Sequence, residues 1–368
     1  MTNPAARLLP ESNYPSKERN RRIWNAEPQT WGLNFEIHLL LGKMIEAFFR
    51  AKIQEKPVGC PMDAQGPLIN ILTLDIEDWC QSSPETLTAS GMSACAAPTM
   101  RAVTNTRRLL SILDEHKTRA TFFILGSLAE AYPSLIRDIH DAGHEVASHG
   151  YHHIPVYFRK PEEFKADVAR SLECLGRIIG GKIKGYRAPY FSIAGSMQWA
   201  LPILADLGIE YDASLFPLHS RYYPLPGWQG AQDGERFPHS FTFGKKRLLE
   251  LPVTTLRVLG QNLPLSGGSF LRLLPLGLFR FAIRNANRCG HPSIFYFHPH
   301  DLDAQDPRMK KPDAPLKKRL MQWGLSIGRG RNEGKLRRLL SEFSFTSIHE
   351  WMNGNRSVSQ TLSEKNLP

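Results

Sequence analysis

The chain has 368 residues, a formal net charge of +11 at neutral pH, and 42% hydrophobic residues. It is longer than the usual single domain, but an α/β barrel uses about 250 residues, so one large domain with extensions fits. The apolar fraction and the seven tryptophans exclude a globally disordered chain. The positive charge favours acidic partners, namely an anionic glycan, a phosphate carrier, a membrane face or nucleic acid, although a basic solvated surface gives the same composition.

The cysteines and the N-terminal segment bear on location. Five scattered cysteines without a CxxC pair indicate neither a disulfide framework nor a cysteine zinc site. Residues 1–28 are too polar for a signal peptide, and charges interrupt residues 31–53 too often for a membrane span. The second segment could instead lie on a membrane surface or dock on the domain. We therefore expect a cytoplasmic protein, with peripheral contact to the inner membrane at most.

Strands and helices alternate along most of the chain. Buried strands are predicted at 68–74, 120–125, 145–148 and 294–297, with a short extended segment at 182–186. Helices are predicted at 100–116, 128–142, 161–179 and 196–207. Polar residues of functional types follow the strands, as at the carboxyl-terminal face of a (β/α) barrel.

The predicted division of the chain has four parts. Residues 1–66 form a partly disordered appendage, 67–303 a barrel, 304–352 a basic extension packed on the barrel, and 353–368 a frayed tail. The basic stretch runs from Arg308 to Arg338, and one helix is expected at 333–343.

A histidine-rich segment after the third strand is the strongest candidate for a metal site. It reads Ser148-His-Gly-Tyr-His-His153. Histidines at i and i+4 face the same side of a helix, so His149 and His153 could bind one cation while His152 points elsewhere. A catalytic divalent site usually has three protein ligands, so a carboxylate is still needed. The alternative is a histidine-rich turn exposed to solvent.

Three carboxylates, Asp75, Glu77 and Asp78, follow the first strand. This cluster could supply the third ligand, and a carboxylate beside the metal could act as a general base on water. A helix cap or a solvated turn is the alternative. The segment Arg187-Ala-Pro189-Tyr190 offers a guanidinium that could hold a carboxylate in bidentate fashion, while proline fixes the loop.

The last predicted strand ends at His298, which fits a general acid that protonates a leaving amine. We expect Asp212, in the segment Tyr211-Asp-Ala-Ser214, to orient and charge this imidazole. A histidine satisfied by its local surroundings is the alternative.

These motifs, in this order, resemble the NodB-type polysaccharide deacetylases (carbohydrate esterase family four) over roughly residues 68–300. The chain looks closest to a subgroup found with exopolysaccharide and exosortase loci. The segments that carry this likeness are Asp75-Ile-Glu-Asp-Trp79, Gly185-Tyr-Arg-Ala-Pro-Tyr-Phe-Ser192, Phe237-Pro-His239, Glu250-Leu-Pro-Val253 and Pro315-Leu-Lys-Lys. The resemblance implies a distorted (β/α)₇ barrel, a zinc-type divalent ion and removal of acetyl groups from N-acetylhexosamine.

The resemblance also implies roles for individual residues. Asp75 matches the base, but the family places base and ligand side by side, so the third ligand here is Asp78 or Glu77. We prefer Asp78, nearest the turn, whereas Glu77 lies on the same strand face as Asp75. The other implied roles are His149 and His153 as ligands, Arg187 holding Asp75, the Tyr190 N–H stabilising an oxyanion, and Trp79, Pro189, Tyr190 and Phe191 contacting sugar. Core packing is the alternative for the aromatic residues.

The sequence therefore predicts a metal-dependent hydrolase that deacetylates a polysaccharide, or its lipid- or nucleotide-linked precursor, in exopolysaccharide biosynthesis. An amidohydrolase of small cyclic amides or ureides on the same barrel is one alternative. A non-catalytic glycan-binding barrel is another. No recognised motif supports nucleic-acid binding. The basic stretch is expected to contact a diphosphate or an acidic glycan.

Overall fold

The computed structural model describes residues 68–79, 81, 99–193, 195–218, 236–258, 261–305, 328–354 and 364–365. The expected N-terminal appendage, with its segment at 31–53, and residues 308–327 of the basic stretch lie outside these ranges. Within the described ranges, no helix is both long enough and apolar enough to cross a membrane.

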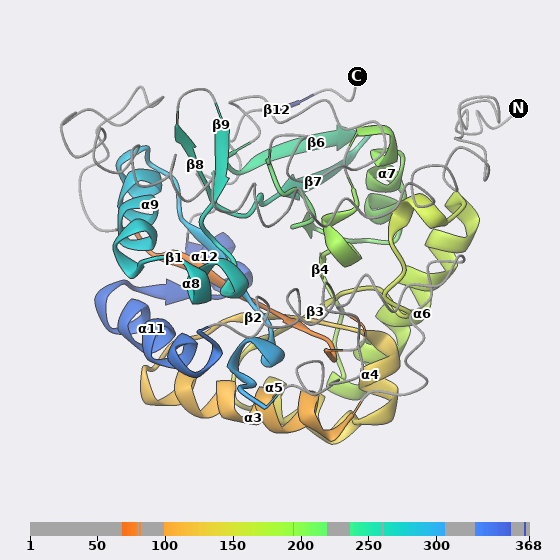
Figure 1. Ribbon diagram of the computed structural model, residues 1–368. Helices are drawn as coiled ribbons and strands as arrows, with labels where there is room; N and C mark the ends of the chain where they lie inside the picture. Colours follow the sequence, from red (N-terminus) through yellow and green to blue (C-terminus); the bar gives the residue numbers. More distant parts are fainter. Residues whose placement is uncertain are drawn as a thin grey trace, which may run out of the picture.

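Parallel strands in the order β10-β1-β2-β3-β4-β5-β7 form the curled sheet of an α/β fold (Figure 1). Their bounds are β1 Asn70–Ile76, β2 Thr121–Ile124, β3 Glu145–Ser148, β4 Gly185–Tyr186, β5 Tyr211–Asp212, β7 Lys246–Glu250 and β10 Ile294–Phe297. The register pairs Leu74 of β1 with Phe297 on one side and with Phe122 on the other. The predicted α/β class is confirmed.

Shorter strands extend this sheet where the sequence had indicated none. The strand β6 (His239–Phe243) runs antiparallel to β7, and β11 (Phe345–Thr346) pairs with β1. A separate hairpin consists of β8 (Thr255–Val258) and β9 (Gln261–Pro264). The strand β12 (Glu364–Lys365) pairs with β6, so these two residues correct the expectation of a frayed tail.

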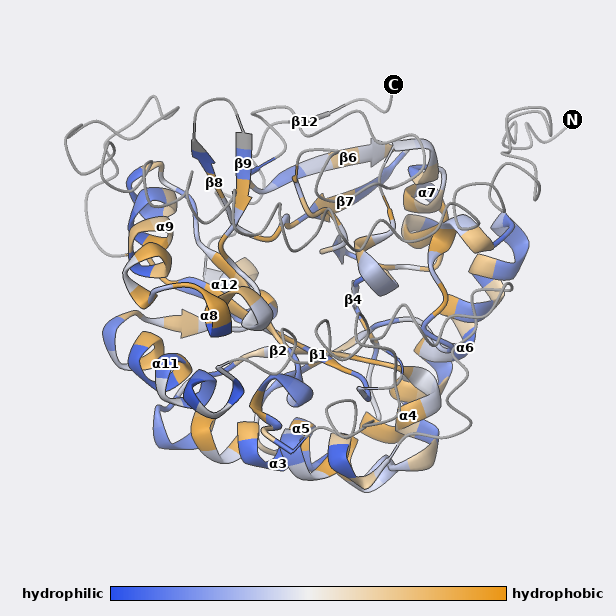
Figure 2. Ribbon diagram, in the orientation of Figure 1, coloured by the Kyte–Doolittle hydropathy of each residue, from blue (hydrophilic) through white to orange (hydrophobic). Residues whose placement is uncertain are grey.

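Most helices lie around the outside of the curled sheet (Figure 1), whereas α12 packs against the inner cluster through Ile348 and Trp351. Their bounds are α3 Met100–Glu115, α4 Gly126–Ala131, α5 Pro133–Asp141, α6 Pro161–Ile179, α7 Ala200–Asp206, α8 Gly268–Leu273, α9 Leu276–Arg288, α11 Arg329–Glu342 and α12 Ile348–Gly354. Figure 2 shows hydrophobic and hydrophilic residues alternating along outer helices such as α3 and α6. The helix expected at 128–142 is divided in two because Pro133 begins a new helix.

The two faces of β1 have different surroundings. Leu72, Leu74 and Ile76 belong to the apolar cluster that includes Leu109 and other residues of the outer helices. Ile71 belongs instead to the cluster inside the curl, with Phe123, Ala147 and Tyr211. Because strand side chains alternate between faces, Thr73, Asp75 and Glu77 follow Ile71 inward, whereas Asp78 follows the outward set. Burying each large apolar side chain contributes about 1.5–3 kcal/mol, which opposes a register shift that would invert these faces.

The described part of the basic stretch is engaged within the protein. The Lys335 ammonium donates to the carbonyls of Leu271, Arg272 and Leu274 at the end of α8. Arg337 pairs with Glu333 on its own helix and with Glu115 on α3. These basic side chains of α11 therefore join it to the neighbouring helices.

Two cysteines lie in the described ranges. Cys174 on α6 is a buried free thiol, and Cys289, just after α9, is disulfide-bonded. The cysteine spacing in the sequence did not indicate this disulfide.

Candidate metal and acid–base site

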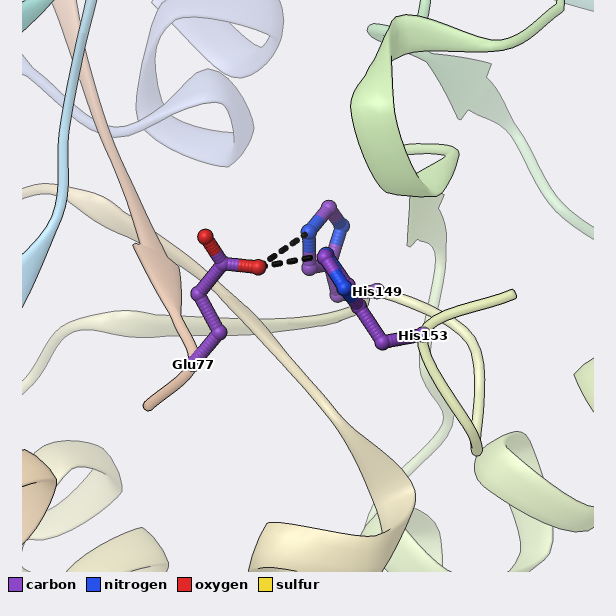
Figure 3. Close-up of side chains that lie close together, drawn as sticks. All are labelled: Glu77, His149 and His153. Carbon is purple, nitrogen blue, oxygen red and sulfur yellow. Dashed lines mark ion pairs between the residues drawn. The ribbon is translucent and has the colours of Figure 1, made fainter. Parts of the chain in front are cut away.

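Glu77, His149 and His153 meet in a buried cluster beyond the carboxyl end of β1 (Figure 3). The Oε2 atom of Glu77 lies 3.8 Å from Nε2 of His149 and closer still to Nε2 of His153. One ligand atom from each residue lies within 4.8 Å of the other two. Each residue is at most 3% exposed. One carboxylate and two imidazoles are thus available to a single cation.

Hydrogen bonds to backbone carbonyls set the tautomers of both histidines. Nδ1 of His149 lies 2.9 Å from the carbonyl oxygen of Arg187, and Nδ1 of His153 lies 2.9 Å from that of Gln81. A carbonyl oxygen only accepts, so each Nδ1 carries the proton and each Nε2 presents a lone pair toward Glu77. When the imidazoles carry a second proton, burial still raises the pKa of Glu77, but His153, His149 and His298 outweigh it and hold this pKa well below its usual range. With the Nε2 atoms unprotonated, one carboxylate and two neutral imidazoles fit a zinc-type divalent ion.

The two histidines are brought together by a loop, not by the helix that their spacing suggested. His149 continues the inward face of β3 after Ala147, and the chain then turns through Gly150 at φ +75°. His153 itself has φ +57°, a left-handed conformation that costs a non-glycine residue about 1 kcal/mol or more. The helical argument for this pair is therefore wrong, although the pair itself is close.

Asp167 on α6 holds this loop in place. Its carboxylate accepts the N–H of Tyr151 at 2.8 Å and Nδ1 of His152 at 2.7 Å, and Arg159 lies 3.0 Å from it. His152 is thereby turned away from the Glu77 cluster. The sequence interpretation did not identify Asp167, which has no motif around it.

Asp78 lies outside the cluster, which corrects the preference for it as the third ligand. Its carboxylate accepts the backbone N–H of Thr99, the residue that caps the N-terminus of α3. Its own N–H donates to the side chain of Gln81 at 2.9 Å. The physical reason is strand alternation: the outward face of β1 points Asp78 toward the helices, whereas Glu77 points inward.

Asp75 is held by the buried guanidinium of Arg187. Nη1 of Arg187 donates to Oδ1 of Asp75 at 2.6 Å and to Thr73 at 2.8 Å, and Nε donates to the carbonyl of Ala213 at 2.9 Å. Arg187 is completely buried, and its guanidinium carbon lies 4.2 Å from the centre of the Phe123 ring. The expected contact with Asp75 is present, but the guanidinium is shared among three acceptors.

His298 faces both inward carboxylates. Its Nε2 lies 3.8 Å from Asp75 and 3.4 Å from Glu77, while its Nδ1 donates to Oδ2 of Asp301 at 3.2 Å. Burial lowers the pKa of His298, but the bond to Asp301 and the charges of Glu77 and Asp75 outweigh it and raise the pKa to about 9. An imidazolium at this position is an available proton donor.

Asp301, not Asp212, supports His298, which corrects the predicted role of Asp212. Oδ1 of Asp212 accepts from the Ser214 hydroxyl at 2.6 Å, and Ser214 accepts the N–H of Ala188 at 2.7 Å. Asp212 also lies opposite Glu250 on β7, and burial raises its pKa to about 6. Asp212 therefore anchors the loop that follows Arg187. A signal for Asp301 was present, because an acid three residues after His298 is the pattern of a capping box.

The aromatic residues expected to contact sugar divide into two groups. Phe191 is 8% exposed and packs edge-on against Phe216 and Tyr296, so it is a core residue, and Pro189 is also buried. Tyr190 is partly exposed, with its ring centre 4.8 Å from that of His153 and its hydroxyl donating to the carbonyl of Gln81 at 2.7 Å. Trp79 is partly exposed at the end of β1, where its role stays a prediction.

Two family models match adjoining parts of the chain. Residues 96–211 match the model described as Polysaccharide deacetylase, and residues 214–353 match Domain of unknown function (DUF3473). A peptidoglycan-N-acetylglucosamine deacetylase of Bacillus cereus is 32% identical over 96 residues, which cover 26% of this chain and 35% of that protein. A chitooligosaccharide deacetylase of Azorhizobium caulinodans is 36% identical over 86 residues, which cover 23% of this chain and 41% of that protein.

These alignments span less than half of the length of the curated relatives. The family model and the relatives together support the polysaccharide deacetylase family for the matched segment. A crystal structure from Mycobacterium smegmatis, named "putative polysaccharide deacetylase", has a TM-score of 0.53 at 21% identity and covers 84% of this chain and 98% of its own. At this identity the likeness concerns the fold alone.

The geometry predicts which residues retain a bound metal. Glu77→Gln, His149→Ala and His153→Ala should each lower zinc affinity by about 10²-fold or more, because each removes one donor of the buried cluster. Asp78→Asn and His152→Ala are matched controls from the same two segments and should retain zinc. Zinc content after dialysis, measured by atomic emission, checks this. Loss of zinc from Asp78→Asn with retention by Glu77→Gln would reverse the assignment.

Proposed function

We propose that this chain, in which the polysaccharide deacetylase match covers residues 96–211, is a metal-dependent hydrolase that removes the acetyl group from N-acetylhexosamine units. The observation that carries the proposal is the pairing of two inward carboxylates at the carboxyl end of β1. Asp75 is held by Arg187, whereas Glu77 is held by His149 and His153. His298 lies within 3.8 Å of both carboxylates. A base, a metal site and an acid are thus adjacent.

In this proposal the metal site and the general base have different chemical roles. Glu77, His149 and His153 would hold the ion, for which Zn²⁺ is our choice on the basis of these donors. When bound, such an ion acidifies water and polarises a carbonyl group. Asp75 accepts the proton of the attacking water, and the hydrogen bond from Arg187 holds its carboxylate in position.

Two further groups act on the departing amine and on the negative charge that develops on the acetyl oxygen. The oxygen of water bonds to the acetyl carbon, the carbon–nitrogen bond breaks, and His298 delivers a proton to the departing amine. The backbone N–H of Tyr190, in a loop where this residue has φ +55°, is our candidate donor to the oxyanion, a role worth about 3 kcal/mol. The products are acetate and the free amine of the sugar.

The likeness to chitooligosaccharide and peptidoglycan deacetylases supports an N-acetylated glycan as the substrate class. Within it, we propose a lipid- or nucleotide-linked precursor of an exopolysaccharide, processed at the cytoplasmic side of the membrane. The basic stretch in the sequence supports an anionic precursor of this kind. The whole stretch is expected to contact the diphosphate, and its residues 308–327 lie outside the described residues.

Acetate release tests the proposed reaction. The zinc-loaded protein should release acetate and an equal amount of free amine from N-acetylglucosamine oligomers and should leave hydantoin-type rings closed. The reverse preference would favour hydrolysis of cyclic amides. Glycan binding measured by calorimetry, with no acetate released, would favour a non-catalytic glycan-binding barrel.

Substituting the proposed base should separate metal binding from turnover. Asp75→Asn should keep zinc but lower kcat by ~10²-fold or more, as expected for a missing general base. The change leaves the buried charge of Arg187 unpaired, so circular dichroism must first show that the variant is folded. If Asp75→Asn strips zinc instead, Asp75 is a ligand and the roles of Asp75 and Glu77 must be exchanged.

Substituting the proposed acid should affect only substrates whose leaving group needs a proton. His298→Ala should retain zinc and lower amide hydrolysis by ~10²-fold, because the amine then leaves without general acid catalysis. An activated acetyl ester, such as a nitrophenyl ester, should lose far less. Asp301→Asn should follow the same pattern more weakly, whereas an equal loss on both substrates would assign His298 another role.

A further inference from the structure

A second set of two imidazoles and one carboxylate lies beside the first. His298, His300 and Asp301 come from the end of β10 and the 3₁₀ turn Pro299–Leu302, and one ligand atom from each lies within 4.8 Å of the other two. The rings of His298 and His300 are stacked, with centres 4.7 Å apart and planes 22° from parallel. Asp301 is 2% exposed, whereas both histidines are partly exposed. This set therefore offers the same kinds of metal ligand as the Glu77 cluster, namely two imidazoles and one carboxylate.

The turn that carries these donors is fixed from several sides. Ser269 donates to Oδ1 of Asp301 at 3.2 Å, and the backbone N–H of His298 donates to Oδ2 at 3.0 Å. From α11, the amide of Asn332 donates to the carbonyl of Asp301, and Arg329 donates to the carbonyl of His300. The donors are therefore held near one another before any ion arrives, which lowers the ordering cost of binding.

The charges around His298 favour a cation. Three carboxylates surround the His298 ring: Asp301 lies 3.2 Å from Nδ1, and Glu77 and Asp75 lie 3.4 and 3.8 Å from Nε2. Arg329 is the opposing charge beside the turn. Imidazole donors select zinc-type ions over Mg²⁺ and Ca²⁺, which prefer oxygen ligands.

We propose that His298, His300 and Asp301 form a second, inhibitory site for a zinc-type ion. An ion held there takes a ring nitrogen of His298 as a ligand, so this side chain is no longer free to serve the departing amine. The added positive charge beside the Glu77 cluster also opposes protonation of that amine, and amide hydrolysis slows. The inhibitory part rests on the proposed function, whereas the binding site itself does not.

The test uses the full chain, first stripped with a chelator and then dialysed against buffered ZnCl₂. His300→Phe keeps an aromatic ring against His298 but removes a donor, and His140→Gln removes an exposed histidine on α5 as the matched control. Zinc bound per chain is measured across a range of free zinc concentrations. Wild type and His140→Gln should bind a second ion that His300→Phe binds about tenfold more weakly or worse. The same isotherm for His300→Phe and wild type would overturn the site.

A second measurement distinguishes this proposal from the proposed function. With deacetylase activity present, excess zinc should inhibit wild type and His140→Gln at concentrations about tenfold below those that inhibit His300→Phe, with Mg²⁺ as the ineffective ion. A second ion that binds through His300 without inhibition would overturn the inhibitory role. If no acetate is released at all, the proposed function fails, and the zinc isotherm still decides the binding site.

Discussion

The buried positive charge of Arg187 is the constraint around which the site is arranged. Removing such a charge from water costs several kcal/mol unless it is paired, and here Asp75, Thr73 and the carbonyl of Ala213 surround it. Its backbone takes part as well, since its N–H donates to Ser148 and its carbonyl accepts from His149. One residue thus ties β1, β3 and the segment after β5 together. Arg187 therefore positions both the proposed base, Asp75, and one histidine of the proposed metal site, His149.

The site is assembled from three separate parts of the chain. The carboxylates Asp75 and Glu77 precede the polysaccharide deacetylase match at 96–211, which contains His149, His153 and Arg187. The proposed acid His298 and its partner Asp301 lie in the second matched segment, 214–353. Within that segment, α11 holds the turn after His298 through Asn332 and Arg329. The second matched segment therefore contributes both the proposed proton donor and the helix, α11, that holds the turn after it.

The strand β1 could be predicted from the sequence, because a run of apolar residues at this point is stable only as a buried strand. The acids at the end of that run marked where the strand ends and where Asp75 and Glu77 lie. The choice between Glu77 and Asp78 depended on where β1 ends, and side-chain alternation through Ile76 decided it. The loop from His149 to His153 could not be predicted, because Asp167 and two left-handed residues shape it. Asp212 was assigned to His298 across a large sequence separation, whereas the true partner, Asp301, lies three residues away.

The central claim is that these parts of the chain form one metal centre at Glu77, His149 and His153. Anomalous X-ray scattering at the zinc edge, from crystals of the full chain with one equivalent of zinc, tests it most directly. The account predicts a single strong peak about 2.0–2.1 Å from Nε2 of both histidines and at a similar distance from the Glu77 carboxylate, with Asp75 and His298 beside it and unbound. A peak coordinated by Asp78, or no peak in this cluster, would contradict the account.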